Sequence, residues 1–297
     1  MTTRSAMWSV RRSLRLLGRQ RAATTTAASG PGETHHHPDT SSSKKKVPVS
    51  SAAGTKKTTK AKKTNSKGGG GATCVRGSEQ GPGRSAEFRA LEKGYKIVAG
   101  LDEAGRGPLA GPVVAGACII PPDVDASEFN INDSKKMTEE EREAAYERLM
   151  AHPRVLCATA MIQHDEIDQI NILQAAMKAM ACALENLPVG KGEKVDYALV
   201  DGPRAPKQLE EMGVAAEPIV KGDSKEMAIA AASVLAKVTR DRIMLEHAKR
   251  WPIYEFEKHK GYPTPAHKAL VLQHGPCPIH RLTFAPIKSM DLTKFRK

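Results

Sequence analysis

The stretch that decides the fold is Ile97-Val98-Ala99-Gly100-Leu101-Asp102-Glu103, an apolar run that ends in two acidic residues. An uninterrupted apolar run of this length is typical of a strand that is buried on both faces of a sheet. The same pattern recurs at Tyr197-Ala198-Leu199-Val200-Asp201. Because functional groups of open α/β sheets gather where strands end, these two acidic ends are the first candidates for a site.

The segments around these two strands complete an α/β pattern. Apolar runs at 113–120, 155–162 and 215–220 predict three more strands. Apolar residues at helical spacing predict helices over 167–187, over 228–251 with Ser224 as its N-cap, and over 265–274. This order of strands and helices predicts an α/β layered domain, followed by a loop-rich C-terminal part.

The acidic residues point to a metal site. If the strands that end at Leu101 and Val200 are neighbours, Asp102 and Asp201 lie within several ångströms of each other. Carboxylates packed so closely repel one another and need protons or a cation. Oxygen ligands suit Mg²⁺ or Mn²⁺ rather than zinc, and two such ions can activate a water and stabilise the leaving oxygen in phosphodiester hydrolysis.

Local structure offers another explanation for two of the acidic residues. Asp201-Gly202-Pro203 is also a good turn, and Asp223, which precedes the long helix, could simply cap it. Spacing alone leaves both explanations open.

The basic charge of the chain is confined to its N-terminal part. The sequence has 297 residues and a net charge of +13. Residues 1–86 hold 17 Lys and Arg against 3 Asp and Glu, a net of +14, whereas the remainder holds 29 basic and 30 acidic residues, a net of −1. Net charge therefore gives no indication that the globular part binds a polyanion, which would need a local patch or metal ions.

The N-terminal part divides into two segments by composition. Residues 1–29 resemble an organellar transit peptide in being rich in Arg, Ser and Thr and free of acidic residues, with a disordered basic tail as the alternative. Residues 30–88 hold too few apolar residues to offset ordering entropy, so we expect a disordered basic linker, a nuclear address or a phosphate-binding segment. We expect a mitochondrial protein, with the nucleus or another organelle as alternatives.

The cysteines and the hydropathy exclude other classes of protein. The five cysteines include no CxxC pair and are expected to be reduced thiols of a non-secreted protein. No apolar run reaches the roughly 20 residues that a membrane span needs, so we expect no membrane association.

A long motif resembles a known family. Residues Asp102-Glu103-Ala104-Gly105-Arg106-Gly107-Pro108-Leu109-Ala110-Gly111-Pro112 resemble the signature of ribonuclease HII, the type 2 ribonucleases H, in their single-subunit bacterial form. Further segments follow in the order of that family and extend the resemblance over residues 96–288: Asn132-Asp133-Ser134-Lys135-Lys136, Val200-Asp201-Gly202, Lys221-Gly222-Asp223-Ser224, residues 229–241, His259-Lys260-Gly261-Tyr262-Pro263-Thr264 and Pro278-Ile279-His280-Arg281.

The resemblance implies a fold and a set of catalytic acids. It implies a ribonuclease H-like mixed five-stranded sheet flanked by helices, which makes residues 89–297 the catalytic domain and residues from about 250 to 297 a helical C-terminal extension. It also implies that Asp102, Glu103, Asp201 and Asp223 hold two Mg²⁺ or Mn²⁺ ions. The expected protein is a monomer that cuts the RNA strand of RNA–DNA hybrids and cuts 5′ of ribonucleotides embedded in duplex DNA.

Substrate contacts are implied for further residues, and each has a structural alternative. Gly105, Arg106 and Gly107 resemble the family's ribose sensor, although a tight turn after a strand would look the same. Tyr262 resembles the tyrosine that stacks at the junction after the ribonucleotide, but it could be a loop aromatic that packs on a helix. Lys135 resembles the lysine near the scissile phosphate, but it could be a solvated turn lysine. Further candidates for phosphate contacts are Lys136, Lys221 and Lys237, whereas Arg240 and Asp241 are expected to form a structural ion pair.

Two other functions remain open from the sequence. The chain could be a nucleic-acid-binding protein whose basic tail is the active part, or a resolvase- or transposase-like nuclease that cuts DNA without ribose. Deletion of residues 1–86 and an all-DNA substrate, respectively, distinguish these alternatives from a ribonuclease H.

Overall fold

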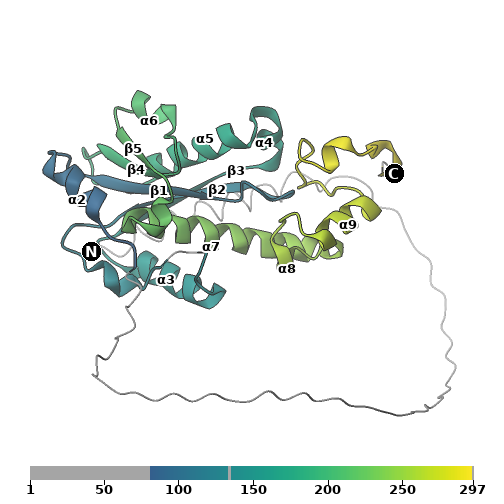
Figure 1. Cartoon of the computed structure of the whole chain (residues 1–297), viewed down its shortest axis with the longest axis horizontal. Helices are drawn as coiled ribbons and strands as arrows, with labels where there is room; N and C mark the ends of the chain where they lie inside the picture. The colour runs from purple at the N-terminus through teal and green to yellow at the C-terminus, as the bar shows by residue number, and fades with distance from the viewer. Residues whose placement is uncertain (1–80, 133–134, 296–297) are drawn as a thin grey trace, which may run out of the picture. The chain divides into compact units, whose positions relative to one another are not determined.

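The computed structural model describes residues 81–132 and 135–295, and Figure 1 shows one mixed sheet between two layers of helices. The predicted transit peptide, most of the predicted linker, Asp133 and Ser134 lie outside the described residues. The strands are β1 Val98–Ala104, β2 Val113–Ile119, β3 Leu156–Ile162, β4 Tyr197–Asp201 and β5 Ala215–Ile219. The α-helices are α2 Ser85–Glu92, α3 Glu139–Ala151, α4 His164–Ile170, α5 Ile172–Glu185, α6 Lys207–Glu211, α7 Met227–Arg250, α8 Phe256–His259 and α9 Pro265–His274.

The five strands form the expected mixed sheet, with β1 at its centre. Their order is β3-β2-β1-β4-β5. Strand β1 pairs antiparallel with β2, and β2 pairs antiparallel with β3. Strand β1 also pairs parallel with β4, and β4 pairs parallel with β5. The prediction of five strands is confirmed, and so is the condition that the two strands ending in acidic residues are neighbours.

The two faces of the sheet are covered by different helices. Alternate residues of a strand point to opposite faces. In β1, Ala99 and Leu101 belong to the apolar core that includes α5, whereas Val98 packs in a cluster with Ile229 of α7. Figure 1 shows α5 on one side of the sheet and the long helix α7 on the other. Even-numbered positions of β1 therefore face α7.

Two glycines allow α7 to lie directly on the sheet. A Cβ atom at Gly100 of β1 would lie 2.1 Å from the carbonyl carbon of Ala228, and one at Gly116 of β2 would lie 2.2 Å from the carbonyl oxygen of Ala232. Both neighbours are helix backbone and cannot rotate away. The close contact of α7 with β1 and β2 therefore depends on the absence of side chains at these positions.

Two features of the predicted helices are wrong. Residues 167–187 form two helices, because Asn171 has a positive φ of 67° and its side chain caps α5 by accepting from the amides of Leu173 and Gln174. Ser224 does not cap the long helix, which begins at Met227 with Glu226 as its N-cap. The Ser224 hydroxyl donates instead to the carbonyl oxygen of Lys221. The short helix predicted over 265–274 is confirmed.

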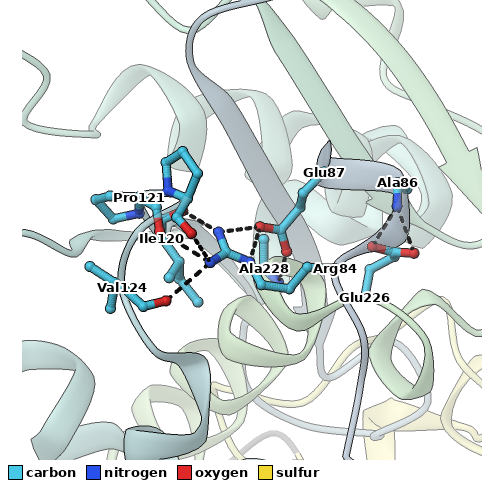
Figure 2. A network of polar contacts seen from close by, with 9 residues as sticks. Arg84, Ala86, Glu87, Ile120, Pro121, Val124, Glu226 and Ala228 are labelled. Carbon is cyan, nitrogen blue, oxygen red and sulfur yellow. Dashed lines mark hydrogen bonds and ion pairs between the residues drawn. The ribbon is translucent and has the colours of Figure 1, made fainter. Parts of the chain in front are cut away.

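Helix α2 starts before the predicted domain boundary at residue 89 and is tied to the sheet by buried charges (Figure 2). The Arg84 guanidinium donates to Glu87 at 2.8 Å and to the carbonyl oxygen of Ile120 at 2.6 Å. Glu87 also accepts from the amide of Ala228 at the start of α7. The Glu226 carboxylate accepts from the Ala86 amide, so α2 and α7 hold each other's first turns. The folded domain therefore includes these residues.

The C-terminal part packs around its own small core. Tyr254, Phe256 and Val271 form a buried cluster with Leu109 and Met244. Among the described residues, the cysteines at 118, 157, 182 and 277 are free thiols, as predicted, whereas Cys74 lies outside the described residues. Within that same part of the chain, no helix combines the length and the apolar character that a membrane span requires.

Candidate active site

The four predicted acidic residues come from three elements that meet at one edge of the sheet. Asp102 and Glu103 lie near the end of β1, and Asp201 is the last residue of β4. Leu101 is paired with Val200, so Asp102 and Asp201 are the next residues along two adjacent parallel strands. Asp223 lies in the short 3-10 helix Gly222–Ser224, between β5 and α7.

Strand geometry turns Asp102 and Asp201 to the same face. Asp102 is two residues beyond Gly100, which contacts α7, and Asp201 is two residues beyond Leu199, which packs with Ile229 of α7. The Asp201 carboxylate then accepts from the Gly222 amide at 2.7 Å and the Asp223 amide at 3.4 Å. These hydrogen bonds hold the segment of Asp223 against the end of β4.

The carboxylates carry negative charge that the protein balances only in part. Burial raises the pKa of Asp102 well above its usual range, and repulsion from Glu103 and Asp201 raises it further. Burial also raises the pKa of Glu103 and of Asp201, the latter with a contribution from the charge of Asp223. Raised pKa values with this cause are typical of carboxylates that share a site for a cation.

Two basic side chains contact the acidic residues from the solvent side. The Lys135 ammonium lies 2.6 Å from Asp223, and the Arg106 guanidinium lies 3.2 Å from Glu103. The pairs are asymmetric in burial, since the Lys135 side chain is 76% exposed whereas that of Asp223 is 4% exposed. Lys135 can therefore rotate away from Asp223 without disturbing the core.

The donor set fits hard divalent cations. Its ligands are carboxylate oxygens, which Mg²⁺ and Mn²⁺ prefer, and their mutual repulsion would be relieved by a bound ion. Within residues 81–132 and 135–295, no three His, Cys, Asp or Glu side chains already have the spacing of a metal-binding group. Lys135 and Arg106 pair with Asp223 and Glu103, and the amides of Gly222 and Asp223 donate to Asp201.

The glycine-rich turn follows directly after the acidic residues. Gly105 has a φ of 101°, and a Cβ atom there would lie 2.2 Å from Nε of the buried Arg240, so this position needs glycine. Arg106 and Gly107 are exposed. A Cβ atom at Gly107 would lie 3.8 Å from the ring of Tyr262, which is itself 38% exposed. The turn and Tyr262 therefore form one continuous surface next to Glu103.

The remaining predicted residues are divided between this surface and other places. Lys237 of α7 lies 5.7 Å from the Tyr262 ring centre, and Lys221 is exposed at the start of the Asp223 segment. Lys136 is exposed and lines a groove on the side of α3. The predicted ion pair of Arg240 with Asp241 is wrong, because Arg240 donates to backbone carbonyls and Asp241 pairs with Lys237.

Sequence reasoning missed three residues that support the site. Ser233 of α7 gives Asp102 a hydrogen bond that favours its ionised form. Arg281 donates to carbonyl oxygens of the glycine-rich turn. Glu226 fixes the segment that follows Asp223. Their partners lie far away in the sequence, and only the family motifs that include Ser233 and Arg281 could have drawn attention to two of them.

A mixed sheet of this order, with carboxylates gathered at the ends of its two central parallel strands, defines a metal-dependent nuclease of ribonuclease H-like architecture. Known proteins agree with this class. A sequence model of the family described as Ribonuclease HII matches residues 99–287. The chain is 48% identical to ribonuclease HII of Endomicrobium trichonymphae over 198 residues, which is 67% of this chain and 90% of that protein. It is 50% identical to ribonuclease HII of Idiomarina loihiensis over 194 residues, which is 65% of this chain and 98% of that protein.

A solved structure agrees as well. The crystal structure of ribonuclease H2 from Pyrococcus horikoshii OT3 superimposes with a TM-score of 0.56 at 29% identity, covering 68% of this chain and 100% of that chain. The chain belongs to the ribonuclease HII family and is a metal-dependent endonuclease that acts on RNA–DNA duplexes.

Proposed function

We propose that this enzyme cuts on the 5′ side of a ribonucleotide, both in RNA–DNA hybrids and at single ribonucleotides in duplex DNA, and leaves 3′-OH and 5′-phosphate ends. The observation that carries the proposal is the continuity of two surfaces. The acidic cluster, Asp102, Glu103, Asp201 and Asp223, passes directly into the turn Gly105–Gly107 and Tyr262. A phosphate at the acidic cluster would bring the neighbouring sugar to the turn.

The acidic cluster would hold two divalent ions, Mg²⁺ or Mn²⁺. Such ions supply activation of a water and neutralisation of charge on the phosphate. Asp102 and Asp201 directly follow the paired residues Leu101 and Val200 of two adjacent strands, so both carboxylates would be available to the same ions. Lys135 pairs with Asp223 and is largely exposed, so its ammonium group can turn toward the scissile phosphate when substrate binds.

The turn and Tyr262 would select ribose. Exposed backbone at Arg106 and Gly107 can approach the 2′-hydroxyl, which distinguishes RNA from DNA. The exposed Tyr262 ring beside Gly107 can stack on the sugar that follows the ribonucleotide. Further candidates for contacts with the duplex backbone are the half-buried Lys237 near Tyr262 and the exposed Lys221 and Lys136.

Variants of the acidic residues test the metal assignment. Asp102→Asn and Asp201→Asn should each abolish turnover, because they remove charge that holds the ions, while duplex binding persists. Activity retained in either variant would refute the assignment. Asp123→Asn is a matched control, because this exposed carboxylate pairs with Arg154 on the surface, and it should leave cleavage unchanged.

A further variant tests the role of Tyr262. Tyr262→Ala should reduce cleavage at a single ribonucleotide in DNA more than cleavage of a long hybrid, because only the former depends on one junction. Equal losses on both substrates would contradict this role. Tyr262→Phe keeps the ring and should retain most of the stacking contribution.

We further propose that the enzyme is monomeric and removes ribonucleotides during replication and repair of mitochondrial DNA. The support for this location is the composition of residues 1–29, which are rich in Arg and lack acidic residues. Imaging of the full chain in cells, beside a chain that lacks residues 1–29, tests the location, and loss of mitochondrial signal only in the shortened chain is expected. Light scattering of the purified protein tests the monomer.

A further inference from the structure

Two arginines lie entirely inside the protein beneath the glycine-rich turn. Arg240 of α7 and Arg281 of the C-terminal part both have an exposed fraction of 0%. Among the salt bridges of the described residues, none includes either arginine, so their partners are neutral. Burying a guanidinium without a carboxylate partner destabilises the fold unless its N–H groups donate hydrogen bonds to other acceptors.

Arg281 uses its donors to close the turn. Its Nη2 atom donates to the carbonyl oxygen of Gly105 at 2.7 Å, and its Nη1 atom donates to that of Arg106 at 3.1 Å. Its Nε and Nη2 atoms also reach the carbonyl oxygen of Gly111 at 3.0 and 2.9 Å. One planar side chain thereby fixes both the beginning and the end of the segment Gly105–Gly111.

Arg240 fixes the other side of the same segment. It donates to the carbonyl oxygens of Ala110 and Pro112 at 3.2 and 3.0 Å. It also donates to that of Lys260 at 3.0 Å, and its guanidinium lies 5.7 Å from the ring centre of Tyr262. Through these hydrogen bonds, the two buried arginines connect the turn with the loop of Tyr262.

The hydrogen bonds of Arg281 determine where the amides of the turn point. The only cis peptide bond of the described residues joins Ala285 to Pro286, so the peptides of the turn are trans. In a trans peptide the N–H points opposite to the preceding carbonyl. Because the carbonyls of Gly105 and Arg106 point inward to Arg281, the amides of Arg106 and Gly107 point outward. Within the described chain, neither amide donates to a protein acceptor. Two adjacent outward amides form a site for an acceptor oxygen.

We propose that Arg281, together with Arg240, is a positioning residue for ribose selection. Arg281 contacts no substrate, and it acts by holding the amides of Arg106 and Gly107 where a 2′-oxygen can accept from them. This inference rests on the proposed function of the turn. It adds a second role for the C-terminal part, beyond supplying a core.

Binding measured without turnover tests this role. The full chain and the variants Arg281→Lys and Arg154→Lys are titrated with two duplexes, one all-DNA and one with a single ribonucleotide, in Ca²⁺ to suppress cleavage. Lysine keeps the charge at position 281 but loses the fork that bonds several carbonyls at once. Arg154 is a matched control, because it pairs with Asp123 on the surface, at the end of the sheet opposite to the acidic cluster.

The expected result is a loss of selectivity rather than of binding. In Arg281→Lys, the preference of the wild type for the ribonucleotide duplex should fall about tenfold, while the Kd for the all-DNA duplex stays within about twofold. Arg154→Lys should keep the preference. If Arg281 has a purely structural role, the substitution should weaken binding of both duplexes equally, and this result would overturn the inference. A wild type that cleaves at the ribonucleotide but shows no binding preference would overturn it as well.

A measurement on the unmodified chain covers the case in which Arg281→Lys does not fold. The amide NMR signals of Arg106 and Gly107 should shift when the wild type binds the ribonucleotide duplex in Ca²⁺, and not when it binds the all-DNA duplex. Identical shifts with both duplexes would refute the inference. Failure of the proposed function is a separate result, since it would be seen as absence of cleavage by the wild type in Mg²⁺ and Mn²⁺.

Discussion

Replacement of Gly100 by alanine should separate the long helix from the sheet and so test the link between the fold and the active site. The new Cβ atom would lie 2.1 Å from the carbonyl carbon of Ala228, whereas ordinary contact begins at 3.4 Å, so α7 and β1 must move apart by about 1.3 Å. The obstacle is backbone, which cannot rotate out of the way. Overpacking of a core costs about 1 to 3 kcal/mol, and we expect the upper end of this range.

The predicted loss is measurable in two assays. About 3 kcal/mol should lower the Tm by about 6 to 12 °C for a domain of this size. Since α7 also carries Ser233, which contacts Asp102, a shift of about 1 Å should reduce cleavage by about a hundredfold. Both values are obtained from thermal unfolding by circular dichroism and from single-turnover cleavage.

Gly83→Ala is the matched control for this substitution. A Cβ atom at Gly83 would have its nearest neighbour at 3.7 Å, and its φ lies outside the left-handed region. The Tm of this variant should be unchanged or raised by up to about 4 °C, since alanine restricts the unfolded chain. A Gly100→Ala protein as stable and active as Gly83→Ala would refute the claim that close contact of α7 with β1 positions the site.

Other perturbations test the charges. Arg84→Ala should lower the free energy of unfolding by about 3 kcal/mol, because it leaves Glu87 buried without its partner. Arg89→Ala breaks an exposed pair and should lower it by less than about 1 kcal/mol. Urea unfolding measures both values. Burial lowers the pKa of His280 to about 3, below its ordinary value of about 6.5, so only the unfolded chain takes up this proton between these values. The stability advantage of wild type over His280→Gln should therefore shrink as the pH falls from 6.5, by up to about 1.4 kcal/mol per pH unit, and a constant difference would contradict the burial of neutral His280. Mg²⁺ at ten times its Kd should raise the Tm by about 3 to 6 °C and EDTA should reverse this, with no rise in Asp201→Asn.

The sequence predicted those parts of the fold that have a local signal. The apolar runs before Asp102 and Asp201 end in acidic residues, and this pattern was sufficient to predict two strands with functional ends. The neighbouring placement of these strands was a condition that only the structure could confirm, because hydrogen-bonded pairing depends on the whole sheet. Helix α3 was missed although Thr138 and Glu141 form a capping box that was visible in the sequence.

Other parts had no local signal. Helix α2 is short, and its first turn is held by Glu226, which lies 140 residues away in the chain. The break at Asn171 depends on a backbone conformation, φ 67° and ψ 161°, that residues other than glycine rarely adopt, so the residue type did not predict it. Arg281 stood inside a recognised motif, but its role became clear only from bonds to carbonyls about 170 residues earlier.

The most direct test of the account is cleavage of an end-labelled DNA duplex that contains one ribonucleotide, beside all-DNA and long-hybrid controls, in Mg²⁺, Mn²⁺ or EDTA. The account predicts a metal-dependent cut on the 5′ side of the ribonucleotide, cleavage of the hybrid and an intact all-DNA control. Cleavage of the hybrid alone would contradict the roles of the turn and Tyr262 at single ribonucleotides. The central claim is that this acidic site hydrolyses the ribose-containing strand of a duplex. Cleavage of the all-DNA duplex would contradict it, and so would a failure to cleave either ribose-containing substrate.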